Sequence, residues 1–265
     1  MTMKNKHIGT LFIFIFINQC TVSPLNRSQV ALYSDEKMAV QGNEIYNEIK
    51  KSTPISANSE KVKYVECITG LLLRGLDDPQ RFRHEWEVSV FEDSQANAFA
   101  LSGGKIGVYV GLLEIADNQH QLAAVIAHEI GHVLARHGNE RLTQTTMRNV
   151  GLLAAQVLGV SDSTIAAIDA STQLGLILPF SRTQESEADN IGLRLMAETG
   201  FDPIESVVLW ENMANNRSEN PPELLSTHPS PESRIKTLRT LMASAEKSWV
   251  SARQSGKNPD CAIAS

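Results

Sequence analysis

The sequence has few of the features that mark membrane-embedded, nucleic-acid-binding or disulfide-rich proteins. Three cysteines in 265 residues exclude a small scaffold held together by disulfides. The formal net charge is −6 and no basic patch occurs, so no nucleic-acid partner is expected. Beyond the N-terminus no segment offers the roughly 18 uninterrupted apolar residues of a membrane span. Repeats and low-complexity tracts are also absent, and a hydrophobic content of 42% can fill a substantial core.

The most informative feature is a pair of histidines at metal-ligand spacing. Residues 127–132 read AHEIGH, and residues four apart lie on one face of a helix. His128 and His132 can therefore ligate one zinc ion. Glu129 then lies beside the metal, where it can take a proton from the attacking water.

The flanking residues favour a helix around this motif. Asn118 with Gln121 resembles an N-terminal capping box, and an apolar series follows at helical spacing. Gly138 supplies a stop. The pattern predicts a helix from about Asn118 to His137.

A hydrolytic zinc site needs a third protein ligand and an open fourth position. Ser181 with Gln184 suggests a second capping box, and Gly200 closes the helix that follows. Glu185 and Asp189 share one face of this helix. We expect Glu185 to reach the zinc and Asp189 to accept an N–H from a ligand histidine or to lie near the leaving group. A solvated acidic first turn is the alternative.

Taken together, His128 to His132 and Glu185-x-x-Ala188-Asp189 resemble the HtpX and CAAX prenyl protease type of zinc metallopeptidase, closest to its soluble periplasmic LoiP/BepA-like branch. Segments 97–104 (NAFALSGG) and 226–234 (STHPSPESR) also match, and the resemblance spans about residues 59–245. It implies one zinc ion per chain. The residues that it assigns are His128, His132 and Glu185 as ligands, Glu129 as general base, and Asp189 as a supporting residue or proton donor.

The resemblance also gives a role to a histidine in a proline-rich stretch. In BepA-like relatives the residue matching His228 lies near the metal, as a removable fourth ligand or as a donor to the tetrahedral intermediate, and a nearby arginine, here Arg234, supports it. Without the resemblance, His228 reads as an exposed loop residue. His120 and His137 are expected at the surface beside the zinc helix.

The N-terminus has the pattern of an export signal. Lys4 and Lys6 form a basic region, and residues 8–17 form an apolar run too short to span a bilayer comfortably. Cys20 follows where a bacterial lipoprotein carries its acylated cysteine, although the preceding Asn and Gln depart from the usual small residues. Cleavage elsewhere or an uncleaved anchor are the alternatives. If Cys20 is acylated, Cys67 and Cys261 remain to pair in an oxidising compartment; otherwise Cys67 is a buried thiol and Cys261 a free one.

Periodicity predicts the remaining elements. Residues 35–51 and 59–76 look helical, residues 84–90 alternate like a half-buried strand, and residues 97–110 read as a hairpin around two glycines. The fold class is α+β: a mainly helical zincin-type metallopeptidase with a small antiparallel sheet and its active site on the His-Glu-x-x-His helix. Asn97, Ala98 and Phe99 belong to the candidate edge strand (97–101) for binding substrate backbone, with a purely structural hairpin as the alternative.

The predicted domains are an export or lipoprotein signal (1–20), an N-terminal helical extension (21–58), a zinc metallopeptidase domain (59–245) and a C-terminal tail (246–265). The resemblance implies a periplasmic endopeptidase, lipid-anchored to the outer membrane if Cys20 is acylated. Its expected substrates are unfolded or misassembled polypeptides, and its expected partners are outer-membrane assembly components. Two alternatives stay open: non-haem iron on the same ligands, and an envelope chaperone or assembly factor with a latent or structural zinc site.

Overall fold

The computed structural model describes residues 20–77, 83–158, 161, 180–215, 223–228 and 231–262. The predicted export signal, with Lys4, Lys6 and residues 8–17, lies outside the described residues.

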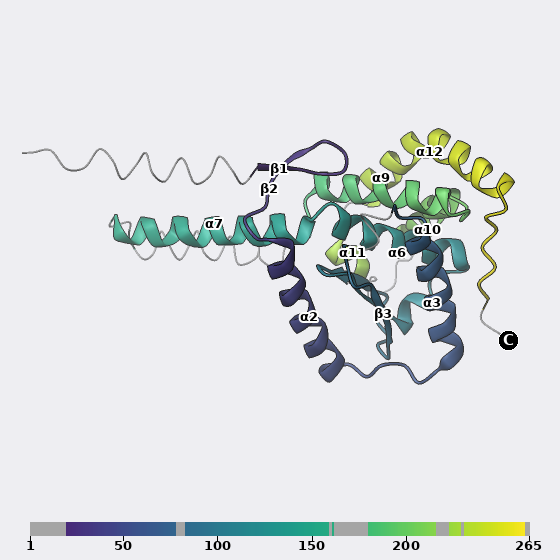
Figure 1. Cartoon of the computed structure of the whole chain (residues 1–265), viewed down its shortest axis with the longest axis horizontal. Helices are drawn as coiled ribbons and strands as arrows, with labels where there is room; N and C mark the ends of the chain where they lie inside the picture. Colours follow the sequence, from purple (N-terminus) through teal and green to yellow (C-terminus); the bar gives the residue numbers. More distant parts are fainter. Residues whose placement is uncertain are drawn as a thin grey trace, which may run out of the picture.

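Figure 1 shows a helical body around a small sheet, from which one long helix projects. The helices are α2 (Asp35–Ser52), α3 (Ser59–Arg74), α5 (Val110–Leu113), α6 (Gln119–Leu134), α7 (His137–Val157), α9 (Arg182–Glu198), α10 (Ile204–Asn215), α11 (Glu223–Thr227) and α12 (Pro231–Gln254). The strands are β1 (Cys20–Val22), β2 (Ser28–Val30), β3 (Glu87–Phe91), β4 (Ala98–Leu101) and β5 (Lys105–Tyr109).

The main sheet has the order β3-β5-β4, which makes β4 an edge strand. Strands β4 and β5 form the expected antiparallel hairpin, with Gly103 and Gly104 at positive φ in its turn. The expectation of a wholly antiparallel sheet is wrong, because β3 pairs with β5 in parallel. After β3 the chain crosses to the opposite edge of the sheet and forms β4. The hairpin turn then leads into β5, which lies between β4 and β3 and runs in the same direction as β3. Strands β1 and β2 form a separate two-stranded hairpin near the N-terminus.

Helices α6 and α9 pack closely at the centre of the body. As expected, Asn118 caps α6 through its side chain, and Ser181 with Gln184 forms a capping box on α9. Glycines allow the close approach. A Cβ at Gly131 would lie 2.8 Å from the carbonyl oxygen of Ala188, and one at Gly192 would lie 2.8 Å from the amide nitrogen of His128. Small residues at the crossing thus let α9 bring its side chains to the motif on α6.

Helix α6 ends earlier than the sequence pattern predicts. The expected continuation to His137, with Gly138 as the stop, is wrong: α6 ends at Leu134, and Arg136 adopts a left-handed conformation with φ 58°. The Arg136 side chain pairs with Asp35 at 2.6 Å, which holds the turn against the start of α2. Helix α7 then starts at His137 in a new direction.

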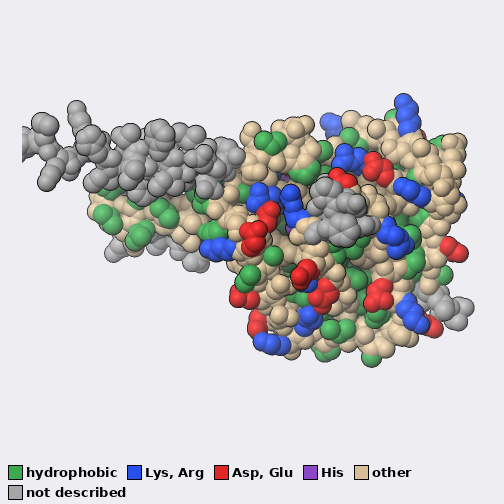
Figure 2. Space-filling view, viewed as in Figure 1, with side chains coloured by type: hydrophobic (Ala, Val, Ile, Leu, Met, Phe, Trp, Pro, Cys, Tyr) green, Lys and Arg blue, Asp and Glu red, His purple; other side chains and the backbone are tan. Residues whose placement is uncertain are grey.

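The far part of α7 carries exposed apolar side chains. Val150, Leu153 and Val157 are 57%, 62% and 81% exposed, and Figure 2 shows hydrophobic side chains along the projecting helix. On the face of the body seen in Figure 2, basic and acidic side chains are interspersed. Within the described part of the chain, no helix has both the length and the apolar character that crossing a membrane requires.

Candidate metal centre

Both motif histidines are buried on one face of α6. His128 and His132 are one helical turn apart, and their Nε2 atoms lie 2.9 Å from each other. Helix α9 supplies Glu185, whose Oε2 is 3.4 Å from His128 Nε2 and whose Oε1 is 3.5 Å from His132 Nε2. The residues predicted as ligands from two distant motifs therefore meet at one point.

A fourth donor comes from the residue directly after α11. The Nδ1 atom of His228 lies 3.2 Å from His128 Nε2 and 3.0 Å from Glu185 Oε1. One ligand atom from each of His128, His132, Glu185 and His228 falls within 4.8 Å of the others, and all four residues are buried. The structure thus brings His228 together with the three predicted ligands, and its role beside a metal stays a prediction.

This donor set fits a metal ion of the zinc type. Three imidazoles and a carboxylate are nitrogen and oxygen ligands that zinc accepts in tetrahedral sites. Glu185 Oε2 is buried without a hydrogen-bond partner and has the Arg234 guanidinium as an ion-pair neighbour at 3.1 Å. This oxygen and the Nε2 atoms of His128 and His132, which lie 2.9 Å apart, are the atoms that would ligate a metal ion.

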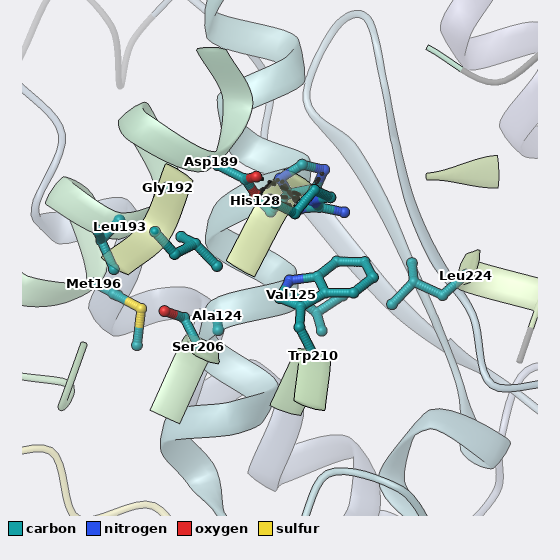
Figure 3. A pocket seen from close by; sticks show the side chains of 12 residues that line it. Ala124, Val125, His128, Asp189, Gly192, Leu193, Met196, Ser206, Trp210 and Leu224 are labelled. Atoms are coloured by element: carbon teal, nitrogen blue, oxygen red, sulfur yellow. Dashed lines mark hydrogen bonds and ion pairs between the residues drawn. The ribbon is translucent and has the colours of Figure 1, made fainter. Parts of the chain in front are cut away.

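The side of His128 turned away from the cluster is held by a buried ion pair. Its Nδ1 atom lies 3.0 Å from Asp189 Oδ1. Arg234, from α12, pairs with Asp189 through Nη2 and lies 3.1 Å from Glu185 Oε2 through Nη1. The Arg234 guanidinium also stacks on Trp210, with Cζ 3.7 Å from the ring centroid. In Figure 3, His128 and Asp189 lie together above a largely apolar wall that includes Trp210.

These contacts shift the pKa values of the site residues. Burial and the Arg234 charge lower the pKa of His128, but hydrogen bonds to Asp189 and Glu185 outweigh them and raise it to about 9. Burial lowers the pKa of His132 well below its usual range. Burial raises the pKa of Glu185, but hydrogen bonds with the three histidines outweigh this and lower it. A metal binds neutral imidazole, so its binding at this site would compete with protonation of His128.

The motif glutamate lies between the cluster and the edge strand. Glu129 Oε2 accepts a hydrogen bond of 3.2 Å from the Ala100 amide, and Glu129 Oε1 is 3.3 Å from His228 Nε2. The Ala98 amide donates to Asn97 Oδ1 at 2.9 Å. The strand that contacts the motif is therefore the edge strand predicted for substrate.

Not all the predicted side chains face the cluster. The Phe99 ring lies over Gly107 and packs against Phe91 and Tyr109, so it belongs to an aromatic cluster on the sheet. Arg234 contacts Asp189, Glu185 and His128, so it supports the ligand pair instead of acting on His228 directly. The contacts of Arg234 join segments that are far apart in the sequence, so no local sequence pattern predicts them.

The expectation that His137 is at the surface is wrong, because this residue is fully buried. The left-handed turn at Arg136 sets α7 at an angle to α6 and directs the His137 ring to the outer side of His132, with the two Nδ1 atoms 2.9 Å apart. Glu187 on α9 is its second neighbour. The sequence analysis did not place His137 or Glu187 beside His132. The one signal that could have suggested it is that each residue lies close in the sequence to one of the two ligand motifs. His120 is half-buried and accepts a hydrogen bond from the Asp202 amide.

The cysteines lie away from the cluster. Cys67 on α3 and Cys261 near the C-terminus form a disulfide with a Cα separation of 5.9 Å. Of the two alternatives for these residues, the structure has the pair. Cys20 starts β1, and its acylation stays a prediction.

A motif glutamate beside a buried histidine and carboxylate cluster, at the edge of a small sheet, defines the metallopeptidase class of hydrolases. Residues 60–242 match Peptidase family M48, and the chain belongs to this family.

Curated relatives fall into two groups. The mitochondrial metalloendopeptidase OMA1 of Schizosaccharomyces pombe is 39% identical over 172 residues, which cover 61% of this chain and 48% of that protein. OMA1 of Saccharomyces cerevisiae is 31% identical over 264 residues, 90% of this chain and 72% of that protein. The beta-barrel assembly-enhancing protease of Escherichia coli O157:H7 is 31% identical over 258 residues, 89% of this chain and 52% of that protein. The chain thus spans about half the length of the first and third relatives.

The second group is consistent with the BepA-like branch of the predicted resemblance. The OMA1 group was not anticipated from the motifs. The finer HtpX and CAAX naming stays a prediction.

Proposed function

We propose that this chain is a zinc-dependent endopeptidase of the bacterial cell envelope that hydrolyses peptide bonds of unfolded or misassembled proteins. The observation that carries this proposal is the position of Glu129 between a four-donor cluster and the edge strand β4. Three histidines favour zinc over non-haem iron, because iron oxygenase sites use two histidines and one carboxylate with open positions.

The chain's own residues divide the catalytic work. When bound, zinc polarises the scissile carbonyl and makes a water molecule acidic enough to lose a proton near neutral pH. Glu129 Oε1 is buried without a hydrogen-bond partner, and it lies 3.3 Å from His228 Nε2. Once His228 moves away, this oxygen can accept that proton and pass it to the leaving amine. Asp189 and Arg234 keep His128 oriented and compensate the Glu185 charge. Arg234 thereby acts as a positioning residue.

In this structure His228 takes the fourth donor position, and we interpret that arrangement as a latent enzyme. The Leu224 amide donates to the Ala96 carbonyl at 3.1 Å, so α11 is fixed beside the start of the edge strand. Opening the site therefore requires residues 223–228 to move away from both the cluster and the strand. In the other role that the resemblance allows, His228 stays and stabilises the developing oxyanion.

Substrate would bind as an added strand along β4. Binding of this kind reads main chain more than side chains, which suits unfolded polypeptides. The amides of Ala98 and Ala100 already have acceptors within the chain. A substrate strand must compete with them, which also favours extended, flexible segments over folded surfaces.

The periplasm is the proposed location. Support comes from the predicted signal at residues 1–20 and from the disulfide between Cys67 and Cys261, which is typical of an oxidising compartment. Acylation of Cys20 would add an outer-membrane anchor. The name of the E. coli relative, beta-barrel assembly-enhancing protease, suggests partners among outer-membrane assembly components.

An envelope chaperone or assembly factor is the second candidate function. It is favoured by the four protein donors, because structural zinc sites are closed by protein ligands whereas catalytic sites keep one position open. In that case the same zinc site would hold the fold and perform no hydrolysis.

Cleavage of an unfolded protein by the purified full chain tests the proposal. We expect activity that a chelator abolishes and zinc restores. Glu129→Gln should keep one zinc per chain but lose well over a hundredfold in kcat, since general-base catalysis contributes roughly 10² to 10⁴. Glu66→Gln, at an exposed position on α3, is the matched control. Full activity of Glu129→Gln would exclude the mechanism, and a cellular function that survives this change would favour the assembly factor.

A further inference from the structure

The outer side of His132 is held by a second histidine that the catalytic scheme does not use. His137 is fully buried, with its ring between His132 and Glu187. Its Nδ1 atom lies 2.9 Å from His132 Nδ1, and its Nε2 atom lies 3.2 Å from Glu187 Oε2. A continuous line of hydrogen-bonding groups thus runs from the candidate metal ligand to a carboxylate on α9.

The chemistry of the groups gives this line a direction. The Glu187 carboxylate lies 2.7 Å from the Arg27 guanidinium and forms an ion pair with it. A carboxylate in such a pair can only accept hydrogen bonds, so His137 donates from Nε2. The Nδ1 atom of neutral His137 then accepts a hydrogen from His132 Nδ1. That tautomer leaves the His132 Nε2 lone pair facing the cluster, as metal ligation requires.

The carboxylate at the end of the line is fixed by the N-terminal hairpin. Arg27, in the turn between β1 and β2, donates from Nε to Glu187 Oε2 at 2.7 Å. Its Nη1 and Nη2 atoms form a bidentate pair with Glu140 on α7, at 2.8 Å each. Gln184 of the α9 capping box donates to the same Glu140 carboxylate at 2.8 Å. One guanidinium therefore ties the hairpin to both helices that flank His137.

These contacts have two explanations. The network could serve only to hold α7 against α9. However, an arrangement that serves only this purpose does not need a fully buried imidazole whose inner nitrogen meets a ligand histidine. Arg27 also lies outside residues 60–242, the part of the chain that matches the family.

We infer that His137 and Glu187 are positioning residues that set the ring and tautomer of His132 for metal binding, and that Arg27 of the N-terminal hairpin holds Glu187 for this task. The inference rests on the proposed function, because it assumes that the cluster binds zinc. It extends the metal site beyond the ligands to a segment that precedes the catalytic domain.

Zinc affinity of the full chain, measured by competition with a chromophoric chelator, tests the inference without relying on activity. His137→Phe keeps a buried ring but removes both nitrogens, and we expect it to weaken zinc binding roughly 10- to 100-fold. His137→Gln keeps an acceptor and a donor at similar spacing and should recover most of the affinity. Arg27→Ala should weaken binding a few-fold, because Glu187 keeps its contact with His137.

Two matched controls separate positioning from general stability. His120→Phe changes a half-buried histidine on the same helix as the ligands, and Arg239→Ala removes an arginine from a surface ion pair with Glu211; both should leave zinc affinity within about twofold. Urea unfolding of the metal-free variants gives a second readout. In the wild type, nitrogen-15 NMR should show His132 protonated at Nδ1.

The outcomes are distinct. Wild-type zinc affinity in His137→Phe, with only the free energy of unfolding lowered, would overturn the inference and leave the network a structural clamp. A failure of His137→Gln to exceed His137→Phe would also contradict it. If the wild-type chain binds no zinc, the proposed function fails, and the inference fails with it.

Discussion

The two ligand histidines of α6 are supported from opposite sides in different ways. His128 meets Asp189 directly, and the Arg234 that neutralises this carboxylate is almost fully buried at 2% exposure. His132 meets His137 first, then Glu187, and the line ends at Arg27, which is 25% exposed. The enclosed support, made of Asp189 and Arg234, is short and surrounded by the core. The open support, made of His137, Glu187 and Arg27, is longer and reaches solvent. A break in the enclosed support leaves a buried charge unpaired, but a break at the open end can be compensated by water.

Glu185→Ala should have the largest effect, because this residue contacts both ligand histidines and also Arg234 of the enclosed support. A methyl group cannot replace a carboxylate ligand, and it also removes the anion facing Arg234. We expect the loss of zinc affinity to exceed the roughly 10- to 100-fold typical of residues that only support a ligand. Glu187→Ala is the comparison variant and should show only that smaller loss, with zinc content and proteolysis measured for both variants. If the comparison variant loses zinc and Glu185→Ala does not, Glu187 is the ligand instead.

His228→Ala tests the fourth donor of the cluster, which comes from the residue directly after α11. If His228 closes the fourth position, the variant should bind zinc but show higher basal cleavage or self-degradation. If it stabilises the oxyanion, kcat should fall roughly 10²- to 10³-fold with little change in substrate binding. We expect the increase, because His228 follows a helix of only 5 residues, and a short segment can move with little change to the rest of the fold. Unchanged steady-state kinetics would remove His228 from both roles.

Asp189→Asn should break the enclosed support and so distinguish it from the open one. The variant leaves the Arg234 charge buried with a weaker partner, which we expect to lower the free energy of unfolding of the metal-free protein by about 3 kcal/mol. Glu187→Gln should cost less, because Arg27 keeps Glu140 and can reach water. Urea unfolding of both variants gives the comparison. Equal losses would mean that the two supports do not differ as described.

Removal of the disulfide should affect the metal site least. Cys67→Ser with Cys261→Ser lowers the stability of a chain whose C-terminus is tied to α3, by roughly 2 to 5 kcal/mol. Neither cysteine touches a support, so the zinc affinity of the folded variant should stay within about twofold of the wild type. A larger fall would show that the supports depend on the whole body of the protein. Chelator competition at a temperature where the variant is folded measures this.

Local signals predicted the elements that carry the ligands. Asn118 and Ser181 cap α6 and α9 through their own side chains, so the start of each helix follows from a few adjacent residues. Glu185 and Asp189 then fall on one face by helical spacing alone. The candidate ligands were therefore accessible from the sequence.

The features that the sequence analysis missed depend on distant partners. The end of α6 is set by Arg136 and its contact with Asp35, about a hundred residues earlier in the chain. The parallel pairing of β3 with β5 depends on which edge β4 occupies, and alternation in a single strand cannot show this. The sequence pattern placed His137 at the end of the helix predicted from about Asn118, as a surface residue. Only the turn at Arg136 explains its burial.

The contacts of Arg27 with Glu187 and Glu140 also affect where the chain should be cut when a fragment is expressed. A fragment cut to residues 60–242, the part that matches the family, would retain every candidate ligand but lose Arg27, the aromatic anchor Tyr46 whose hydroxyl bonds the Ile106 carbonyl, and Cys261. Such a fragment could fold and still bind zinc more weakly than the full chain. The weaker binding would then reflect where the chain was cut, so an expressed fragment should begin no later than the first strand of the hairpin.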